Sequence, residues 1–164
     1  MKECKQFLNK INFDEIYSII MGPYFPWYYN DFVNYEDEDK TDQNFQFTHT
    51  FYKENSIHSD FFKFLNPILN IIKPSIIIRV KANLLTKTNK IIEHGMHKDT
   101  SFNFKHTTAI FYINKNNGYT RFINNVKIKS EENKFVEFDS DLLHTGSTCT
   151  DEKKRIVLNL NYIK

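Results

Sequence analysis

The sequence predicts an α+β fold that is mostly β, with supporting helices at the front of the chain and a jelly-roll core behind them. Apolar residues between Ser59 and Ile72 recur at spacings of three and four, as on one face of a helix. After Pro74 the period changes to two and stays there, as in strands. About eight short strands joined by short turns are typical of a double-stranded β-helix of the jelly-roll or cupin kind.

Length and composition are those of one folded domain. The chain has 164 residues, 16% of them aromatic, which is enough apolar material for a core. We expect a single domain over residues 1–164, with a support region of helix and loop over 1–75 and the double-stranded β-helix over 76–164. The net charge of only +2 gives no general attraction to nucleic acid, so nucleic acid is not an expected partner.

The cysteines and the N-terminus indicate the compartment. Cys4 and Cys149 lie far apart and neither belongs to a C-x-x-C pair, so both are expected to be reduced thiols. The first residues are charged, and no stretch approaches the roughly 18 apolar residues of a membrane span. We therefore expect a cytoplasmic protein with no membrane partner.

The front region is predicted to contain short elements. Asn12 and Glu15 have the spacing of a capping box, which would open a helix that ends at Met21. The aromatic run over 25–30 favours core packing over a wall of a substrate pocket. Residues 36–40 form an acidic loop that is expected at the surface. Alternation over 45–52 predicts a strand, in which His49 is expected to be a hydrogen-bonded sheet residue.

The helical stripe that ends at Ile72 should cover the back of the sheet. It contains Pro67, which lacks a backbone N–H and should break or kink the helix. Asn66 is then expected to cap a second short segment.

The β half begins with a strand over 76–85. Its even positions are all apolar and should pack on the helices, whereas its odd positions include Arg79 and Asn83 as candidate pocket residues. A polar turn over 86–90, a strand over 91–99 and a loop over 101–105 should follow, the loop bordering the predicted site. The next strand, over 106–114, places Thr108 and Tyr112 on one face.

The remaining strands are predicted to be short. The run Asn116-Asn117-Gly118 is typical of a hairpin turn into a strand over 119–122. Further strands are expected over 126–128 and 134–138. The segments 144–147 and 155–163 are expected to form the last pair.

One group of residues in the β half has the composition of a metal site. Residues two apart on a strand point to the same face, so His97 and Asp99 would present an imidazole and a carboxylate side by side. The same rule turns His94 outward. His144 would supply a second imidazole. Two imidazoles and one carboxylate bind one face of an octahedral Fe(II) ion and leave three positions open. A lone His-x-Asp occurs by chance, so order, spacing and strand setting together support the prediction.

A basic residue follows His144 at the start of the last predicted strand. Arg155 can bind a carboxylate through two parallel hydrogen bonds if it lies inside a pocket. We therefore expect it to anchor a 2-oxo-diacid co-substrate beside the metal.

His97-x-Asp99, the distal His144 and Arg155 resemble the 2-oxoglutarate- and Fe(II)-dependent oxygenases, and the segments 111–114 and 118–122 resemble their prolyl 4-hydroxylase-like branch. The resemblance covers about half of the chain. It implies Fe(II) at His97, Asp99 and His144, with 2-oxoglutarate and O2 as co-substrates. The implied reaction couples oxidative decarboxylation of 2-oxoglutarate to hydroxylation of a C–H bond.

The resemblance also implies roles for residues near Arg155. Tyr112 would hydrogen-bond the distal carboxylate of 2-oxoglutarate, and Thr108 and Asn159 would support the groups that make direct contact. Prolyl hydroxylases usually carry a tyrosine on the strand before His-x-Asp, where this chain has Leu85; Asn83 is the candidate substitute. The front region carries no obvious peptide-binding module, which argues against a proline substrate.

Three other functions stay open. The first is a demethylase of nucleobases or methylated side chains, with Trp27, Tyr28 and Tyr29 as a stacking platform. The second is a non-catalytic cupin-like binding module. The third is a cupin-like isomerase with another metal, which would not need Arg155. The sequence leaves open the prime substrate, a protein, a peptide or a small molecule, and the oligomeric state.

Overall fold

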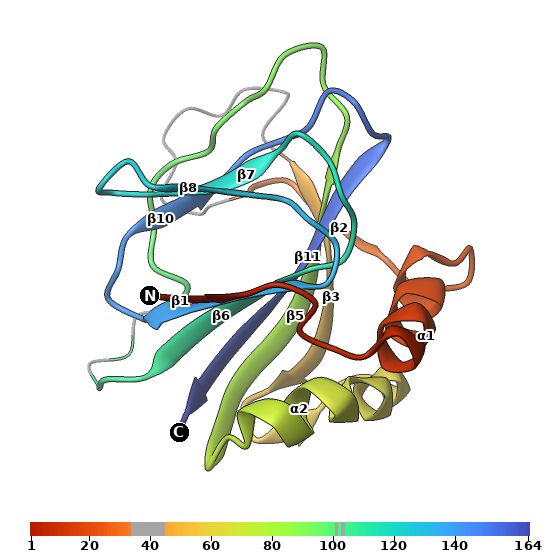
Figure 1. The fold of residues 1–164 in the computed structure, drawn as a ribbon, viewed down its shortest axis with the longest axis vertical. Helices are drawn as coiled ribbons and strands as arrows, with labels where there is room; N and C mark the ends of the chain where they lie inside the picture. Colours follow the sequence, from red (N-terminus) through yellow and green to blue (C-terminus); the bar gives the residue numbers. More distant parts are fainter. Residues whose placement is uncertain (34–44, 101, 103) are drawn as a thin grey trace.

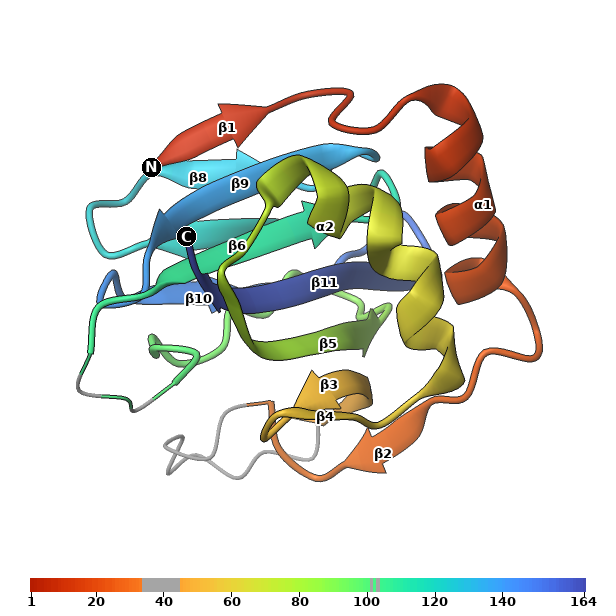
Figure 2. The ribbon, with the colours of Figure 1, turned by 90° about the horizontal axis from the view of Figure 1, so that it is seen from below.

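The chain folds into two facing antiparallel sheets with helices packed on the outer side of the larger one (Figures 1 and 2). This computed structural model describes residues 1–33, 45–100, 102 and 104–164. The larger sheet has the strand order β1-β9-β6-β11-β5-β3-β2, with β4 paired to β3, and the smaller has the order β10-β7-β8. The predicted mostly β jelly-roll is confirmed.

The strands have the following bounds. In the larger sheet they are β1 (Lys2–Cys4), β2 (Tyr28–Asn30), β3 (Gln46–Lys53), β4 (Ser56–Ile57), β5 (Ile76–Thr86), β6 (Thr107–Tyr112), β9 (Lys134–Asp139) and β11 (Lys154–Ile163). In the smaller sheet they are β7 (Tyr119–Phe122), β8 (Lys127–Lys129) and β10 (His144–Gly146). The front region therefore contributes β1 to β4 to the larger sheet, where helix and loop with a single strand were predicted.

The helices are α1 (Lys10–Met21), the 3-10 helix η1 (Asp60–Leu65) and α2 (Asn66–Ile72). The cap of α1 is Asn9, whose side chain accepts a hydrogen bond from the Asn12 backbone N–H, so the prediction of Asn12 as the cap was wrong. The predicted break near Pro67 is the change from η1 to α2. The N-cap of α2 is Leu65 rather than the predicted Asn66. None of these helices in the described ranges is both long and apolar enough to cross a membrane.

Two apolar clusters lie on opposite faces of the larger sheet. The first joins the helices to the sheet and includes Ile16, Ile68 and Phe111. The second lies between the two sheets and includes Tyr112, Phe122, Phe138 and Val157. Alternation along each strand divides its residues between these clusters, so the inner face of β5 looks toward the smaller sheet.

The predicted faces of β5 hold over most of its length. Val80, Ala82 and Leu84 pack in the first cluster, while Arg79 and Asn83 face the space between the sheets. The register between β11 and β5 shifts at Asn161/Tyr162, where Ile78 is skipped. This irregularity reverses the alternation, so Ile77 rather than Ile76 packs on the first cluster, and Ile76 is 52% exposed.

The predicted hairpin at Asn116–Gly118 was wrong. The strands on either side of it, β6 and β7, belong to different sheets, so this segment crosses between them. Gly118 has no left-handed backbone angle; it is needed for space, because a Cβ there would lie 2.7 Å from Arg155 Cδ and 2.8 Å from the Thr148 carbonyl oxygen. The predicted last pair was also wrong, because β10 pairs with β7 and β11 pairs with β5 and β6.

The segment 91–99 is not the continuous strand that was predicted. It is joined to its neighbours by two isolated bridges, Glu93 to Ser147 and His97 to His144. Residues 36–40 of the predicted acidic loop lie outside the described residues, as do residues 101 and 103 of the predicted loop over 101–105.

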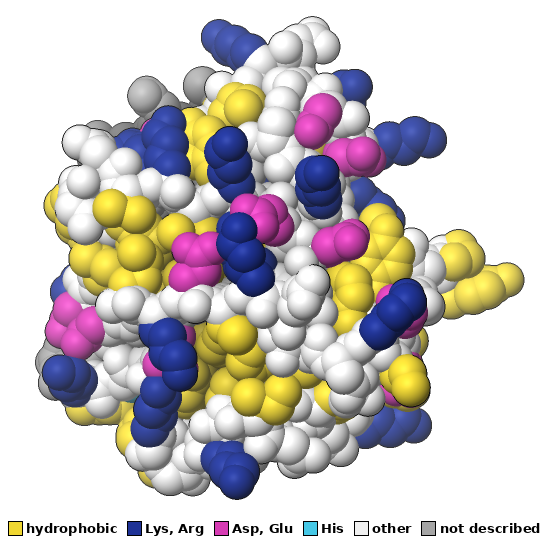
Figure 3. All heavy atoms as spheres, in the orientation of Figure 1, with side chains coloured by type: hydrophobic (Ala, Val, Ile, Leu, Met, Phe, Trp, Pro, Cys, Tyr) yellow, Lys and Arg dark blue, Asp and Glu magenta, His cyan; other side chains and the backbone are white. Residues whose placement is uncertain are grey.

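The cysteines, His49 and the aromatic run were also described by the sequence predictions. Both cysteines are free thiols. His49 is a sheet residue whose ring nitrogens contact the Pro26 carbonyl and the Ser59 hydroxyl, as expected. In the aromatic run, Phe25 is buried, whereas Tyr28 and Tyr29 are 62% and 59% exposed. The face drawn in Figure 3 mixes basic, acidic and apolar side chains without a block of one charge.

Candidate metal centre

The side chains of His97 and Asp99 meet that of His144, which is distant in sequence, between the two sheets. One ligand atom each from His97, Asp99 and His144 lies within 4.8 Å of the other two. The backbones of the two histidines form a bridge, with N–H to carbonyl hydrogen bonds of 2.9 and 3.1 Å in the two directions. This bridge brings the start of β10 against the His-x-Asp segment.

Backbone carbonyls fix both imidazoles in the tautomer that a metal requires. His97 Nδ1 lies 3.0 Å from the Gly95 carbonyl oxygen, and His144 Nδ1 lies 3.1 Å from that of Leu142. A carbonyl oxygen only accepts, so each Nδ1 carries the proton and each Nε2 has a free lone pair. Burial lowers the pKa of His144, which keeps this ring neutral.

Asp99 is a buried carboxylate beside a cation. Its side chain is 3% exposed, and its two oxygens lie 3.4 Å from Arg79 Nη2 and 3.9 Å from His144 Nε2. Burial alone would raise the pKa of Asp99, but the positive charges around it, those of Arg79 and Lys81 among them, outweigh that effect and leave it below its ordinary value. The carboxylate is therefore ionised at neutral pH.

The donor set fits a ferrous ion. Two neutral imidazole nitrogens and one carboxylate oxygen form the set that binds Fe(II) on one face and leaves the other face open. The remaining nitrogen of each ring is already bonded to protein, as is usual for metal-binding histidines.

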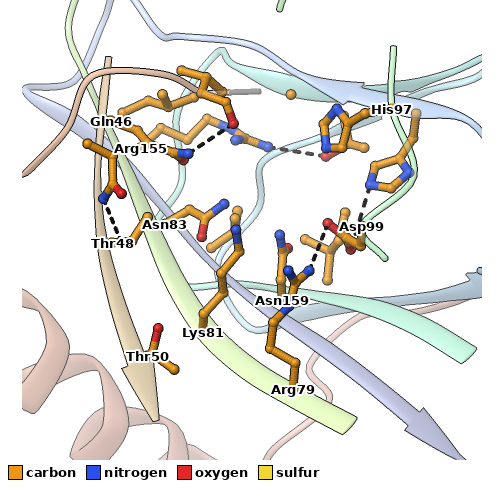
Figure 4. Close-up of a pocket in the computed structure, with 18 of the residues that line it drawn as sticks. Gln46, Thr48, Thr50, Arg79, Lys81, Asn83, His97, Asp99, Arg155 and Asn159 are labelled. Carbon is orange, nitrogen blue, oxygen red and sulfur yellow. Dashed lines mark hydrogen bonds and ion pairs between the residues drawn. The ribbon is translucent and has the colours of Figure 1, made fainter. Parts of the chain in front are cut away.

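A polar cavity of about 330 Å³ opens beside these three residues (Figure 4). It is bounded by the inner faces of β5, β3 and β11 and by the start of β10. The side chains that line it include Gln46, Thr48, Thr50, Arg79, Lys81, Asn83, Leu85, Ile110, Thr120, Arg155, Val157 and Asn159. A second cavity, lined in part by Ile76, Ile78, Phe102, Phe104 and Leu143, adjoins it at Arg79 and Asp99.

Arg155 is a buried cation in this cavity. It is 3% exposed, and it donates from Nε to the Ser130 hydroxyl at 2.8 Å and from Nη2 to the Thr120 hydroxyl at 3.2 Å. No acidic side chain of the described residues forms an ion pair with it. Burial lowers the pKa of Arg155, but a guanidinium stays charged in proteins. The site therefore presents an uncompensated positive charge.

The other predicted contacts divide into two groups. Asn83 and Asn159 line the cavity, and each has a buried Oδ1 without a hydrogen bond. Tyr112 and Thr108 are not among its lining residues. This corrects the expected direct contact of Tyr112, whereas Thr108 was expected only as a supporting contact. The Tyr112 hydroxyl donates to the Thr120 hydroxyl at 2.8 Å, and Thr108 Oγ1 accepts from Asn161 at 3.0 Å. Tyr112 and Thr108 therefore lie behind the side chains that line the cavity.

Several residues of this site were missed in the sequence, among them Lys81, Thr120 and Asn161. Lys81 shares a strand face with Arg79 and Asn83, so alternation alone could have identified it. Thr120 and Asn161 become relevant only through the packing of one strand against another. The sequence carries no local signal for them.

Glu93 links the His-x-Asp segment to the smaller sheet through ion pairs and a hydrogen bond. This carboxylate lies 2.6 Å from Arg121 Nη2 and 3.4 Å from Lys127 Nζ, and it accepts a hydrogen bond from the Tyr119 hydroxyl. The Arg121 guanidinium is the main reason that the pKa of Glu93 falls to about 2. The cluster therefore stabilises the segment that carries His97 and Asp99.

We expect Glu93→Gln to lower the free energy of unfolding by about 1 to 2 kcal/mol at pH 7, allowing for solvent screening of a side chain that is 27% exposed. A carboxyl with a lowered folded pKa stabilises the fold fully above its ordinary pKa of 4.5 and loses that effect as the pH falls toward 2. Urea unfolding across this range should show the two proteins converging at low pH. Glu15→Gln, on the exposed side of α1, should cost little at any pH. If the difference in the free energy of unfolding between the wild type and Glu93→Gln does not change with pH, Glu93 does not have the lowered pKa proposed for it.

Solved structures share this fold over nearly the whole chain. An oxidoreductase of the 2OG-Fe(II) oxygenase family from Burkholderia pseudomallei is 12% identical, with 98% of this chain and 82% of that chain covered at a TM-score of 0.68. A prolyl hydroxylase from Trichoplax adhaerens, solved with a hypoxia inducible factor peptide, is 12% identical over 99% and 82% of the two chains, with a TM-score of 0.69. The epimerase SnoN, solved with Fe3+, alpha ketoglutarate and nogalamycin RO, is 9% identical over 99% and 78%, with a TM-score of 0.69.

No protein-family model matches the sequence, and no curated protein matches it. At these low identities the likeness shows the fold. The chain has the fold of the 2OG-Fe(II) oxygenases, prolyl hydroxylases among them.

Proposed function

We propose that this chain, with the fold of the 2OG-Fe(II) oxygenases, is a 2-oxoglutarate- and Fe(II)-dependent dioxygenase. The observation that carries the proposal is the convergence of His97, Asp99 and His144 in one cavity with the uncompensated charge of Arg155. When bound, Fe(II) would supply the chemistry that couples oxidative decarboxylation of 2-oxoglutarate by O2 to oxidation of a substrate C–H bond. Hydroxylation is the outcome that we propose.

The spacing between the metal ligands and Arg155 suits a five-carbon diacid. Gly146 lies two residues beyond His144 on β10, a distance of about 6.6 Å along a strand. A Cβ on Gly146 would lie 3.6 Å from Arg155 Nη1, so the guanidinium reaches this point of the strand. The four C–C bonds of 2-oxoglutarate span about 5 Å when extended. One end of the molecule can therefore lie at the metal ligands while the other meets Arg155.

The protein's part in this chemistry is orientation and exclusion of water. Arg155 would neutralise the distal carboxylate, with its own position fixed by the Ser130 and Thr120 hydroxyls. Leu85, Ile110 and Val157 give the cavity its apolar lining. Such a lining strengthens the ion pair and keeps water from a reactive centre.

The test is stepwise. Anaerobic titration should show one Fe(II) per chain and 2-oxoglutarate binding that depends on the metal. Admission of O2 should then release succinate, with a higher yield when the true substrate is present; prolyl peptides are the first candidates to add. Zn(II)-loaded protein should bind 2-oxoglutarate but release no succinate. A chain that binds neither metal nor 2-oxoglutarate would instead be a binding module.

A further inference from the structure

Lys81 is a cation that the proposed function does not use. It lies on the inner face of β5, paired in register with Thr50 of β3 and Asn159 of β11. Figure 4 shows its side chain extending into the cavity beside Asn83. Among the described residues it has no hydrogen bond or ion pair. Burial lowers the pKa of Lys81 to about 8, so most of it is still protonated at neutral pH.

The charges of the described residues in the cavity do not balance even with both proposed ligands bound. Among these residues the inner cations are Arg79, Lys81 and Arg155, against the single carboxylate of Asp99. Ferrous iron and 2-oxoglutarate carry equal and opposite charges, so together they leave the excess of two positive charges unchanged. The two other lysines of the lining, Lys53 and Lys98, have their own partners in Glu54 and Asp141. Uncompensated buried charge is costly, so a further anion is expected.

Buried hydrogen-bond acceptors also line the cavity. Gln46 Nε2 donates to the carbonyl oxygens of Phe32 and Val33 at 3.1 and 2.9 Å, which fixes the orientation of this amide. Its Oε1 is buried and has no hydrogen bond to any described residue, and the same holds for Oδ1 of Asn83. A buried acceptor without a partner calls for a ligand that brings an N–H or O–H.

This part of the cavity is formed by β3 and β5, whereas His144 and Arg155 lie on β10 and β11. The cross-strand pairs Thr48 with Asn83 and Thr50 with Lys81 form its floor. Its surface is mostly hydroxyl, amide and ammonium, which suits a polar molecule better than a proline ring. Arg79 lies two residues from Lys81 on the same face, so both long side chains can reach one acid group.

We infer, resting on the proposed function, that the oxidised substrate is a small polar acid. Its carboxylate or phosphate binds Lys81 beside Arg79, and its N–H or O–H donates to Oδ1 of Asn83, two residues from Lys81 on the same face of β5. The chain then has two acid-binding positions, Arg155 for the co-substrate and Lys81 for the substrate. Lys81 is a specificity-determining residue in this assignment.

The experiment is calorimetric titration of protein loaded with Mn(II) and 2-oxoglutarate, which allows binding without turnover. The carboxylate probes are malate and glycerate, each beside its methyl ester; the phosphate probe is glycerol 3-phosphate beside glycerol. At least one acid should bind about 10- to 100-fold more tightly than its neutral counterpart. Whether a carboxylate or the phosphate binds identifies the acid group.

Variants then locate the binding position. Lys81→Met should weaken the acid by about 10- to 100-fold and leave the Kd of 2-oxoglutarate within about twofold, whereas Lys81→Arg should retain most acid binding. Lys63→Met removes the same charge from the exposed face of η1 and should change neither constant. Thermal melts of each variant establish that it is folded.

Three results would overturn the inference. In the first, no acid binds better than its neutral counterpart. In the second, Lys81→Met binds the acid as well as the wild type does. In the third, Lys81→Met loses 2-oxoglutarate itself, which would make Lys81 the co-substrate anchor. Failure of the wild type to bind Mn(II) or 2-oxoglutarate would be a different result, because it would refute the proposed function.

Discussion

His97→Ala is expected to abolish tight Fe(II) binding and all succinate release. Loss of a residue that only orients a metal ligand costs about 10- to 100-fold in affinity, so loss of a ligand should exceed about 100-fold. His97 is the best ligand to replace because it is only half-buried and, within the described part of the chain, the one aromatic ring beside its own is that of His144. His144 itself packs on Phe138 with ring centroids 4.8 Å apart, so its removal would also open the core.

Metal content after anaerobic loading and the metal-dependent change in stability are the two measurements. Fe(II) at 100 times its Kd should stabilise the wild-type protein by about 2.7 kcal/mol and should leave His97→Ala unchanged. His58→Ala, at an exposed position directly after β4, is the matched control and should behave as the wild type does. Stoichiometric, stabilising Fe(II) in His97→Ala would show that the metal lies elsewhere.

The metal-binding residues could be predicted from the sequence because side chains two residues apart in an extended segment point to the same face. His97 and Asp99 point the same way although the segment is not a regular strand, since a single bridge to His144 keeps the backbone extended there. The same alternation identified Arg79 and Asn83 on the inner face of β5. Where an irregularity interrupts it, at Ile78, the prediction failed for Ile76 and Ile77.

Strand pairing could not be predicted in the same way. Asn116–Gly118 has the composition of a hairpin turn, yet the chain crosses there from one sheet to the other. Gly118 is required by the Arg155 side chain, which lies 37 positions later in a strand of the other sheet (155 − 118). Contacts of this kind depend on topology, and no local pattern reports them.

The role of Tyr112 could not be predicted either, because it also depends on how distant strands pack. Alternation correctly placed it on the inner face of β6, in the cluster between the sheets. Which hydroxyl of that layer reaches the cavity depends on how β7 packs over β6. Thr120 of β7 lies between Tyr112 and Arg155 and accepts hydrogen bonds from both. Tyr112 therefore orients Thr120 rather than lining the cavity.

Arg155→Met should raise the Kd of 2-oxoglutarate by about 100-fold or more while Fe(II) affinity stays near the wild-type value. Removal of one partner of a buried, hydrogen-bonded charge pair costs about 2 to 5 kcal/mol, and each 1.4 kcal/mol is tenfold in affinity. The variant should fold, because the partners left behind are the neutral hydroxyls of Ser130 and Thr120. Calorimetric titration of 2-oxoglutarate into Mn(II)-loaded protein measures the effect.

A graded series separates the charge of Arg155 from its position. Arg155→Lys keeps the charge but loses the paired hydrogen bonds, so its Kd should lie between those of the wild type and Arg155→Met. Ser130→Ala removes the hydroxyl that accepts from Arg155 Nε at 2.8 Å, and its loss of about 1 kcal/mol should weaken 2-oxoglutarate by about fivefold. An isomerase that uses another metal has no need of a diacid anchor. Unchanged 2-oxoglutarate affinity across this series would therefore favour that function over the dioxygenase, because the buried guanidinium would then have no part in binding the co-substrate.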